Sequence, residues 1–462
     1  MIRAAALAAL ALILAQALVI GRVELTFDEA YYALWAHFPQ AGYLDHPPLV
    51  AWIIAASMGV FGGGEFGVRA LFWLSGALVP ALIALLGWRL FADARAAAAA
   101  VLFWVAAPLV AGAPLATPDT PLVFFWTLAL LGLCEVWRGR AGAWALVGLA
   151  TGAAGLAKMS AGFLALGIVL ALAATPSLRR QFARPGPWLA GALALAVLSP
   201  FLWWNAAHGY ATLFKQGGRL AAARFAPGYL GEFVGVQLAL FNPLTAGAAI
   251  FAALRLRARP SEPMRLLLAT CAPALMYFVV HALHDRVQGN WPAPLYPAFC
   301  LIAARAVTQV PRLRWVPFAA AALGGAATVL AYLHLALGGP TLGPADPALR
   351  IGGWRELAQS VFTEARARDA GFVLAEGYAA TSLLAFYGPA DARLGELGEP
   401  ERWTFRPAID TRGAGLAFLR PAFADELNRR FAHVEPLQTL RRRVGAVELE
   451  PYALYWVSGQ RR

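Results

Sequence analysis

Hydrophobic residues fill most of the chain in long blocks that are separated by short polar loops. A helix needs about 20 apolar residues, within a range of about 17–25, to cross the hydrocarbon core of a bilayer. Blocks of this kind predict a polytopic α-helical membrane protein with about eleven transmembrane helices, the first of them an uncleaved span. The blocks lie near residues 3–20, 66–88, 97–114, 121–137, 142–157, 160–175, 187–205, 236–254, 266–283, 292–309 and 315–337.

One apolar block, Leu49–Phe61, is too short to cross a bilayer and is followed by three glycines. We expect it to form a helix that lies in the membrane interface, with Trp52 as an anchor. A second interfacial helix is expected to begin at residues 28–32. The first outer loop, about residues 21–62, would then carry both helices. If residues 49–61 crossed the membrane instead, Asp28 and Asp119 would fall on opposite faces.

Arginines cluster after every second predicted span, which is the distribution that the positive-inside rule predicts for cytoplasmic loops. The clusters are Arg89 and Arg95; Arg138 and Arg140; Arg179, Arg180 and Arg184; Arg255, Arg257 and Arg259; Arg312 and Arg314. The remaining loops hold carboxylates, histidines and Lys215, and we place them on the outer face. An odd number of spans then puts the C-terminus on the outer face as well.

The composition changes near residue 338 to that of a soluble α/β domain. We therefore predict two domains, a transmembrane catalytic domain over residues 1–338 and a periplasmic α/β domain over residues 339–462. Periodicity in the second domain predicts helices over 354–369, 378–387 and 421–431, and strands over 371–375, 414–419, 444–449 and 452–457.

Composition agrees with a membrane protein, because 60% of the residues are hydrophobic and only 14% are charged. The net charge of +12 consists almost entirely of arginines in short loops, so membrane topology explains it better than a nucleic-acid partner. Cys134, Cys271 and Cys300 lie in apolar blocks without motif spacing, and predict no disulfide framework or zinc site. The chain has no P-loop, dinucleotide fingerprint or nucleophile elbow.

The strongest candidate for catalysis is the carboxylate pair Asp28 and Glu29 in the first outer loop. In an adjacent pair, one carboxylate can face a cavity while its neighbour orients a helix or a cation. A carboxylate in a low-dielectric site suits general-base catalysis on a hydroxyl or amine. The alternative is that the pair caps the start of an interfacial helix.

Two further outer-loop motifs carry acids. In the sequence YLDHPP (43–48), Asp45 could bind a divalent cation and His46 could contact a phosphate, or the motif could be an ordinary turn stiffened by two prolines. In TPDTP (117–121), Asp119 could cap the following helix. A chemical role for Asp119 requires that it meet Asp28 in space.

Cationic and aromatic residues of later outer loops are candidates for binding. Lys215 and Arg219 are four residues apart and would share one face of a helix, where they suit a lipid phosphate or a headgroup. The sequence HDRVQGNWP (284–292) supplies polar and aromatic groups that could bind substrate or form an interfacial belt. Its candidate binding residues are His284, Arg286, Asn290 and Trp291.

The motifs DEAYY (28–32), GYLDHPPLVAW (42–52), TPDTPL (117–122) and GNWPAP (289–294) resemble those of bacterial GT-C membrane glycosyltransferases. The resemblance is greatest to the group related to protein O-mannosyltransferases and aminoarabinose transferases. It implies a polyprenyl-phosphate-sugar donor, a periplasmic active site and transfer with inversion. Asp28 would correspond to the catalytic aspartate and Asp119 to a second acid, while Arg219 would bind phosphate. The motif tyrosines Tyr31, Tyr32 and Tyr43 join the predicted substrate-binding residues.

Two positions depart from the pattern that the resemblance implies. His46 stands where aminoarabinose transferases carry a lysine that contacts the lipid phosphate, and Gln216 stands where a histidine is expected. Asp45 would be the ligand of a divalent metal if the protein holds one.

We therefore predict an inverting glycosyltransferase of the bacterial inner membrane that moves a sugar from a polyprenyl-phosphate donor to a lipid, glycan or protein acceptor. The alternative is a flippase for a lipid-linked sugar that uses the same carboxylates as a proton relay. Against it, the chain shows no repeated half. A non-catalytic membrane scaffold would leave the carboxylate-rich loop unexplained.

Overall fold

The computed structural model describes residues 1–218, 225–256, 260–339, 341–343 and 346–461. The chain forms two compact units, each assembled from segments that are distant in the sequence. The helical unit contains Met1–Leu18, Ala41–Val50 and Ala70–Leu333. The mixed unit contains Val19–Gln40, Ala51–Arg69 and His334–Arg462, so it combines most of the first outer loop with the C-terminal sheet domain.

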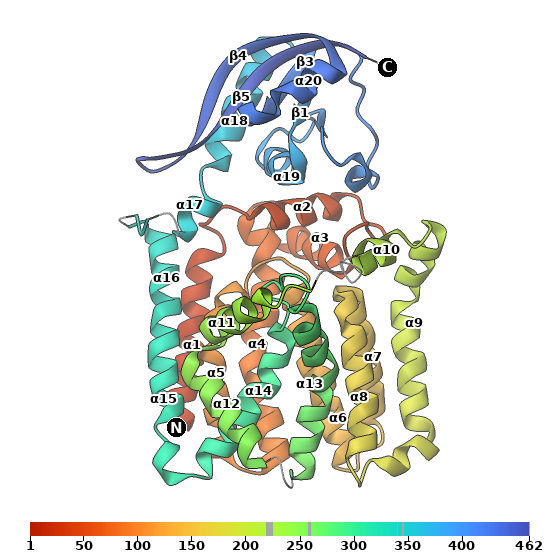
Figure 1. Ribbon diagram of the computed structural model, residues 1–462, viewed down its shortest axis with the longest axis vertical. Coiled ribbons are helices and arrows are strands. Elements are labelled where there is room, and N and C mark those ends of the chain that lie inside the picture. The colour runs from red at the N-terminus through yellow and green to blue at the C-terminus, as the bar shows by residue number, and fades with distance from the viewer. Residues whose placement is uncertain (219–224, 257–259, 340, 344–345, 462) are drawn as a thin grey trace. The chain divides into compact units, whose positions relative to one another are not determined.

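Most elements of the helical unit are α-helices joined by short turns (Figure 1). Neighbouring pairs such as α6 and α7, α7 and α9, and α8 and α13 pack against each other. The α-helices are α1 (Ile2–Val19), α4 (Glu65–Phe91), α5 (Ala94–Val105), α6 (Asp119–Trp137), α7 (Ala143–Ala157), α8 (Gly162–Ala174), α9 (Pro185–Ala207), α10 (Ala211–Gly218), α11 (Gly228–Phe241), α12 (Pro243–Leu256), α13 (Glu262–His281), α14 (Tyr296–Thr308), α15 (Val316–Ala320) and α16 (Ala326–Leu337). Shorter turns of helix are η1 (Pro108–Gly112), η2 (Met159–Ala161), η3 (Arg179–Ala183), η4 (Ala293–Leu295), η5 (Pro311–Leu313) and the π-helical η6 (Ala321–Gly325).

Within the described residues, six helical segments are long and apolar enough to cross a membrane. They are Ile2–Val19, Glu65–Phe91, Asp119–Trp137, Pro185–Ala207, Glu262–His281 and Pro311–Leu337, and each overlaps a predicted span. Four other predicted spans correspond to the shorter apolar helices Ala94–Val105, Ala143–Ala157, Met159–Ala174 and Ala293–Thr308. The multi-span helical fold is therefore confirmed, while the number of eleven spans stays a prediction.

The predicted span over residues 236–254 is not one straight helix, which corrects the sequence-based prediction. It is divided into α11 and α12, which meet at an angle of 109°. At the junction, Asn242 has a φ of 74°, and Pro243 has no backbone N–H to continue the helix. The buried Asn242 side chain donates to the carbonyl oxygens of Ala106 and Ala320, both at 3.3 Å. The break is therefore fixed by internal hydrogen bonds.

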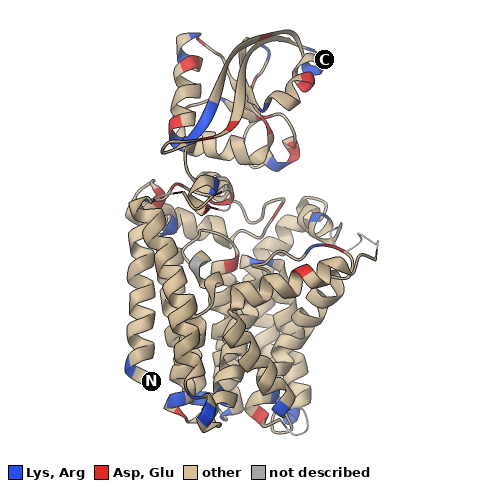
Figure 2. Cartoon of the chain, turned by 60° about the vertical axis from the view of Figure 1, so that its left-hand side comes forward, with Lys and Arg blue, Asp and Glu red and all other residues tan. Residues whose placement is uncertain are grey.

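Charged residues of the helical unit are unevenly distributed. Arginines gather at the end of the bundle that holds the N-terminus (Figure 2), whereas the two lysines pair with Asp119 and Asp45. Ion pairs there join Arg89 and Arg140 to Glu135, at 3.1 and 3.0 Å. Arg89 and Arg140 belong to two of the arginine clusters that the sequence shows.

The mixed unit is built on a five-stranded sheet with the order β2-β1-β3-β5-β4. Strands β2, β1 and β3 are parallel, and β3, β5 and β4 are antiparallel. In register, Val373 pairs with Leu394 and Leu416, and Leu416 pairs with Trp456. The elements of this unit are α2 (Phe27–His37), α3 (Leu49–Phe61), α17 (Pro347–Ile351), α18 (Trp354–Ala367), β1 (Val373–Ala375), α19 (Gly377–Tyr387), β2 (Leu394–Glu396), η7 (Pro400–Trp403), β3 (Gly415–Leu419), η8 (Pro421–Phe423), α20 (Ala424–Arg430), β4 (Phe431–Val444) and β5 (Val447–Gln460).

Several predicted elements of this domain agree with the structure, but its C-terminal end was predicted wrongly. Periodicity predicted two short strands over 444–449 and 452–457, whereas β5 is one continuous strand. It also missed β2 and β4. Strand β4 is largely exposed and carries Glu435, Arg441 and Arg443 at exposed positions, so it lacks the apolar alternation that identifies a strand.

Candidate functional site

The candidate catalytic residue Asp28 lies in the first turn of α2 in the mixed unit. Thr26 caps this helix, and Glu29 completes a capping box with it. The Glu29 carboxylate accepts hydrogen bonds from the backbone N–H and the hydroxyl of Thr26, at 3.0 and 3.1 Å. The capping box fixes where α2 begins and leaves Asp28 half-buried beside it.

Glu29 also forms a buried, bidentate ion pair with Arg69 at the start of α4. Both nitrogen–oxygen distances are 2.7 Å, and the two side chains are 0% and 3% exposed. Arg69 further donates to the carbonyl oxygens of Val23 and Glu24, at 2.6 and 2.8 Å. These bonds favour a structural role for Glu29, which orients the helix and a cation.

The aromatic residues that follow Asp28 are packing residues of the mixed unit. Tyr31 is only 1% exposed, and its hydroxyl donates to the carbonyl oxygen of Arg402 at 3.0 Å. The Tyr32 ring is buried against Tyr31 and Trp35. Burial of this kind favours support of α2 over direct contact with a substrate for Tyr31 and Tyr32.

A second candidate centre lies in the helical unit around Asp119, the first residue of α6. One carboxylate oxygen of Asp119 accepts a hydrogen bond from Lys158 Nζ at 2.7 Å. The other accepts from Asn290 Nδ2 at 2.8 Å. The fold therefore brings together Asp119 and Asn290, two residues predicted from separate motifs, and adds Lys158, which ends α7.

A third group, also in the helical unit, surrounds Asp45. The Asp45 carboxylate is buried and pairs with Lys215 Nζ at 3.1 Å. Gln216 donates to the Asp45 carbonyl oxygen at 2.6 Å, and the Thr212 hydroxyl donates to that of Tyr43 at 2.7 Å. Helix α10 thus holds the YLDHPP turn in place. The turn itself closes through a hydrogen bond from Tyr43 N to the carbonyl oxygen of His46 at 3.2 Å.

The residues around Asp45 do not form a divalent metal site. Among the described residues, no group of three or more histidine, cysteine, aspartate or glutamate side chains is arranged to hold a metal ion. Asp45 instead faces the Lys215 ammonium group.

The remaining predicted residues lie in the loop after α13 or outside the described residues. Arg286 forms an exposed ion pair with Glu232 at 2.7 Å. His284 bonds to the carbonyl oxygen of Val280 at 3.0 Å, and the Trp291 ring lies 5.5 Å from that of His281. Arg219, the predicted phosphate-binding arginine, lies outside the described residues, so the proposed pairing of Lys215 with Arg219 on one helix face stays a prediction.

Three residues next to the candidate acids were not singled out from the sequence. They are Arg69, Lys158 and Tyr378, and the last donates a hydrogen bond to Asp28 at 3.4 Å. The sequence could have drawn attention to Lys158, because Lys158 and Lys215 are the only lysines of a chain whose other basic side chains are mostly arginines. The partners of Asp28 and of Asp119 belong to different units, and a meeting of these two acids stays a prediction.

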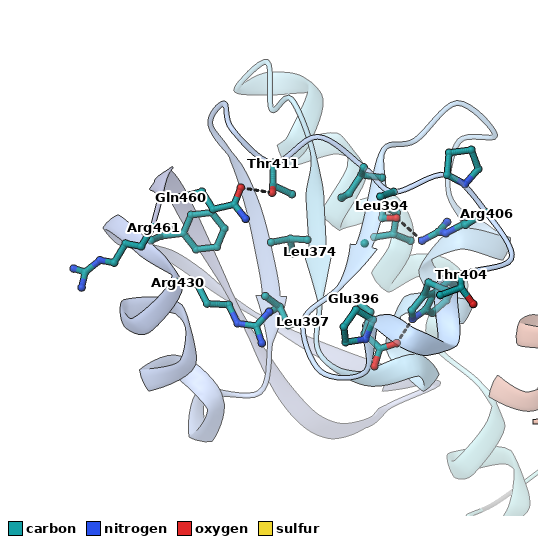
Figure 3. A pocket seen from close by; sticks show the side chains of 17 residues that line it. Leu374, Leu394, Glu396, Leu397, Thr404, Arg406, Thr411, Arg430, Gln460 and Arg461 are labelled. Atoms are coloured by element: carbon teal, nitrogen blue, oxygen red, sulfur yellow. Dashed lines mark hydrogen bonds between the residues drawn. The ribbon is translucent and has the colours of Figure 1, made fainter. Parts of the chain in front are cut away.

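The mixed unit also contains a cavity of about 490 Å³ beside the sheet, lined by Leu374, Leu394, Glu396, Arg406 and Arg430 among others (Figure 3). Its polar groups bond chiefly to each other. Glu396 accepts from the Trp403 ring N–H, and Arg406 donates to the Leu394 carbonyl oxygen at 2.5 Å. Burial raises the pKa of Glu396 and lowers that of Arg406. These bonds hold the loop after β2, whose Trp403 and Phe405 pack on Tyr31 of α2.

Comparison with known proteins gives matches to one kind of enzyme. Residues 45–204 match the family described as dolichyl-phosphate-mannose-protein mannosyltransferase. The chain is 27% identical to lipid A galacturonosyltransferase RgtD of Rhizobium johnstonii over 60% of its own length and 59% of the relative's. It is 34% identical to an undecaprenyl phosphate-α-4-amino-4-deoxy-L-arabinose arabinosyl transferase of Pseudomonas fluorescens, over 28% of its own length and 23% of the relative's. The chain thus spans little more than half the length of the galacturonosyltransferase, and about a quarter of the length of the arabinosyl transferase.

Solved structures give a fold match over nearly the whole chain. The structure of ArnT from Cupriavidus metallidurans bound to undecaprenyl phosphate matches with a TM-score of 0.71 at 17% identity, covering 97% of this chain and 96% of that one. The oligosaccharyltransferase AglB from Archaeoglobus fulgidus matches with a TM-score of 0.52 at 12% identity, covering 83% of this chain and 63% of that one. The solved structures show a shared fold, and together with the family match and the relatives named above they confirm the resemblance inferred from the loop motifs.

Proposed function

We propose that this chain, a member of the GT-C superfamily of membrane glycosyltransferases, transfers a sugar from a polyprenyl-phosphate donor to an acceptor in the bacterial envelope. The observation that carries the proposal is the fold match to ArnT over 97% of the chain. Because relatives are named as transferases acting on lipid A or using undecaprenyl-phosphate sugars, lipid A is the acceptor that we would test first.

In the proposed reaction, Asp28 removes the proton from the acceptor nucleophile as the nucleophile attacks the anomeric carbon of the sugar. A new bond forms from the acceptor oxygen or nitrogen to this carbon. The bond from the same carbon to the phosphate oxygen breaks on the opposite face, which inverts the configuration. The proton ends on Asp28, and the electron pair of the broken bond leaves with the polyprenyl phosphate.

The leaving phosphate needs positive charge close to it, and charge stabilisation of this type is usually the largest contribution to catalysis. We assign this role to Lys215, which Asp45 holds at 3.1 Å, together with His46 and Arg219. Asp119 is held between Lys158 and Asn290 and would orient the acceptor or the base.

The proposal also assigns a location. The chain would be a multi-pass protein of the inner membrane, with the arginine-rich loops in the cytoplasm, as the positive-inside rule predicts. The acidic loops and the C-terminal domain would then face the periplasm, where lipid-linked sugars meet envelope acceptors. None of the relatives and solved structures named above is a flippase.

The experiment that tests this function is mass spectrometry of lipid A and envelope glycans from cells with the gene, without it, and with an Asp28→Asn variant. Asp410→Asn, which changes an exposed carboxylate of the mixed unit, is the matched control. We expect one glycan to disappear in the deletion and in Asp28→Asn but to persist in the control. Loss in the deletion with retention in Asp28→Asn would disprove the role of Asp28. Accumulation of a lipid-linked sugar on the cytoplasmic leaflet would instead support the flippase.

A further inference from the structure

A side chain of the C-terminal domain contacts the candidate base. Tyr378, in the first turn of α19, donates a hydrogen bond from its hydroxyl to Asp28 Oδ1 at 3.4 Å, across 350 residues of sequence. We infer that Tyr378 is a positioning residue for the transfer reaction, by which the C-terminal domain holds the Asp28 carboxylate in its productive orientation. The inference rests on the proposed function of Asp28.

The sheet of the mixed unit places Tyr378 at a position suited to this role. β1 is bonded on both sides to parallel strands, and α19 follows directly after its carboxyl end. In open α/β sheets, functional side chains gather at the carboxyl ends of the strands. Glu376 fixes this end through hydrogen bonds to the backbone and side chain of Arg420, and Gly377 supplies the positive φ of 60° with which α19 begins.

The Tyr378 ring is held on several sides, so its hydroxyl has a defined direction. It packs edge-on against Phe27 and Tyr31 of α2, with ring centroids 5.7 and 5.4 Å apart. The Arg402 guanidinium lies over the ring, 4.4 Å from its centroid. Residues on both sides of Asp28 in α2 therefore contact the same tyrosine.

A hydrogen-bond donor on the base has a chemical consequence. It restricts rotation of the carboxylate that, in the proposed reaction, takes the proton from the acceptor. A small misplacement of a catalytic group costs much of the rate, since transfer requires the reacting atoms in near-attack geometry. Catalytic hydrogen bonds are often long before substrate binds and tighten in the complex, which accommodates the 3.4 Å distance.

The same helix offers a matched control. Tyr387, at the other end of α19, also uses its hydroxyl to hold the outer-loop segments: it accepts from Leu25 N at 2.7 Å and donates to Glu65 Oε1 at 3.2 Å. An arginine, Arg355, lies over its ring as Arg402 lies over Tyr378, here at 4.6 Å from the centroid. Both tyrosines are half-buried. Of these two tyrosines, Tyr378 is the one that contacts Asp28.

The test compares Tyr378→Phe and Tyr387→Phe in the purified full-length chain, each with and without Asp28→Asn. The probes are undecaprenyl-phosphate-linked 4-amino-4-deoxy-L-arabinose and its galacturonosyl counterpart, with lipid A as acceptor. We expect Tyr378→Phe to lower kcat about tenfold with little change in KM for the donor, as expected for one lost hydrogen bond to a charged group. Tyr387→Phe should leave kcat unchanged.

The Asp28→Asn background separates positioning from general stability. If Tyr378 acts through Asp28, Tyr378→Phe lowers kcat no further once Asp28 is already asparagine. Equal losses in both tyrosine variants, or a further loss from Tyr378→Phe in the Asp28→Asn background, would overturn the inference. Full activity of Asp28→Asn, in contrast, would disprove the proposed base.

A stability readout keeps the inference testable if neither probe is transferred. Thermal unfolding of wild type, of the three single variants Asp28→Asn, Tyr378→Phe and Tyr387→Phe, and of the two double variants gives two double-mutant cycles. The losses of stability caused by Asp28→Asn and Tyr378→Phe should be coupled, so that the double variant loses less than their sum. The losses caused by Asp28→Asn and Tyr387→Phe should add. If the stability losses add in both double variants, the bond from Tyr378 to Asp28 does not hold the carboxylate, whatever the substrate is.

Discussion

At the scale of single residues, the candidate site is organised by pairs of opposite charge. Each lysine of the chain pairs with an aspartate of an outer-loop motif, Lys158 with Asp119 and Lys215 with Asp45. Each pair holds an ammonium group in a defined position beside a carboxylate, before any substrate binds.

The pair of Glu29 and Arg69 gives a prediction about stability. Replacing Arg69 by Met leaves the Glu29 carboxylate buried without its guanidinium, and breaking a buried ion pair in this way typically costs about 3–5 kcal/mol. We therefore expect a large fall in the melting temperature of the purified protein, measured by thermal unfolding in detergent.

Arg412→Met is the matched control, because Arg412 pairs with Asp410 at an exposed position. Surface ion pairs contribute little, and this variant should unfold at nearly the wild-type temperature. If both arginine variants unfold at the wild-type temperature, the buried pair does not anchor the first outer loop.

At the scale of secondary-structure elements, the break between α11 and α12 falls inside an apolar block that predicted one continuous span. Asn242 bonds to the carbonyl oxygens of Ala106 and Ala320, which lie at the ends of α5 and α15, so three elements meet at one side chain. Gly324 in η6 permits this approach, since a Cβ at that position would lie 1.8 Å from the Ala106 carbonyl oxygen.

Two substitutions at residue 242 separate the contributions to this break. Asn242→Ala loses the side-chain bonds and keeps an unfavourable positive φ; each effect costs about 1–3 kcal/mol. Asn242→Gly loses the same bonds but tolerates the φ of 74°. We expect both variants to unfold below wild type, with alanine below glycine, as measured by thermal unfolding. Equal melting temperatures for the two variants would show that the positive φ carries no strain.

At the scale of the whole molecule, each of the two compact units combines segments that are distant in the sequence, and the domain boundary near residue 338 stays a prediction. The mixed unit joins residues 19–40 and 51–69 to the C-terminal sheet domain, although more than 260 residues of the helical unit lie between them in sequence. Glu24 is one of the groups that make this connection. Its carboxylate accepts from the backbone N–H groups of Trp354 and Arg355, at 2.8 and 3.4 Å.

The connection through Glu24 should depend on pH. Burial raises the pKa of Glu24 above its ordinary value, because desolvation outweighs the hydrogen bonds that favour the charged form. A carboxyl whose pKa is higher in the folded state contributes stability below its unfolded pKa, and this contribution is lost as the pH rises through the folded pKa. Glu24→Gln keeps an acceptor oxygen and removes the titration. Relative to the variant, wild type should therefore lose stability as the pH rises from about 4 to 7.

Thermal unfolding of both proteins across this range measures the effect. A difference in melting temperature between wild type and Glu24→Gln that stays constant with pH would contradict the raised pKa. A difference that grows in favour of wild type at higher pH would mean that the hydrogen bonds from Trp354 and Arg355 outweigh burial.

The sequence by itself determined the features that depend on local composition and spacing. Apolar blocks gave the membrane-type helical fold, Leu49–Phe61 is a helix with the predicted bounds, and the motifs around Asp28, Asp45 and Asp119 gave the family resemblance. Long-range pairing could not be derived in this way, because nothing in local periodicity specifies which distant residues meet. Only the tertiary structure placed Arg69 on Glu29, Lys158 on Asp119 and Tyr378 on Asp28. The same limit applies to the break at Asn242 and to the exposed strand β4, since each depends on neighbours far away in the chain.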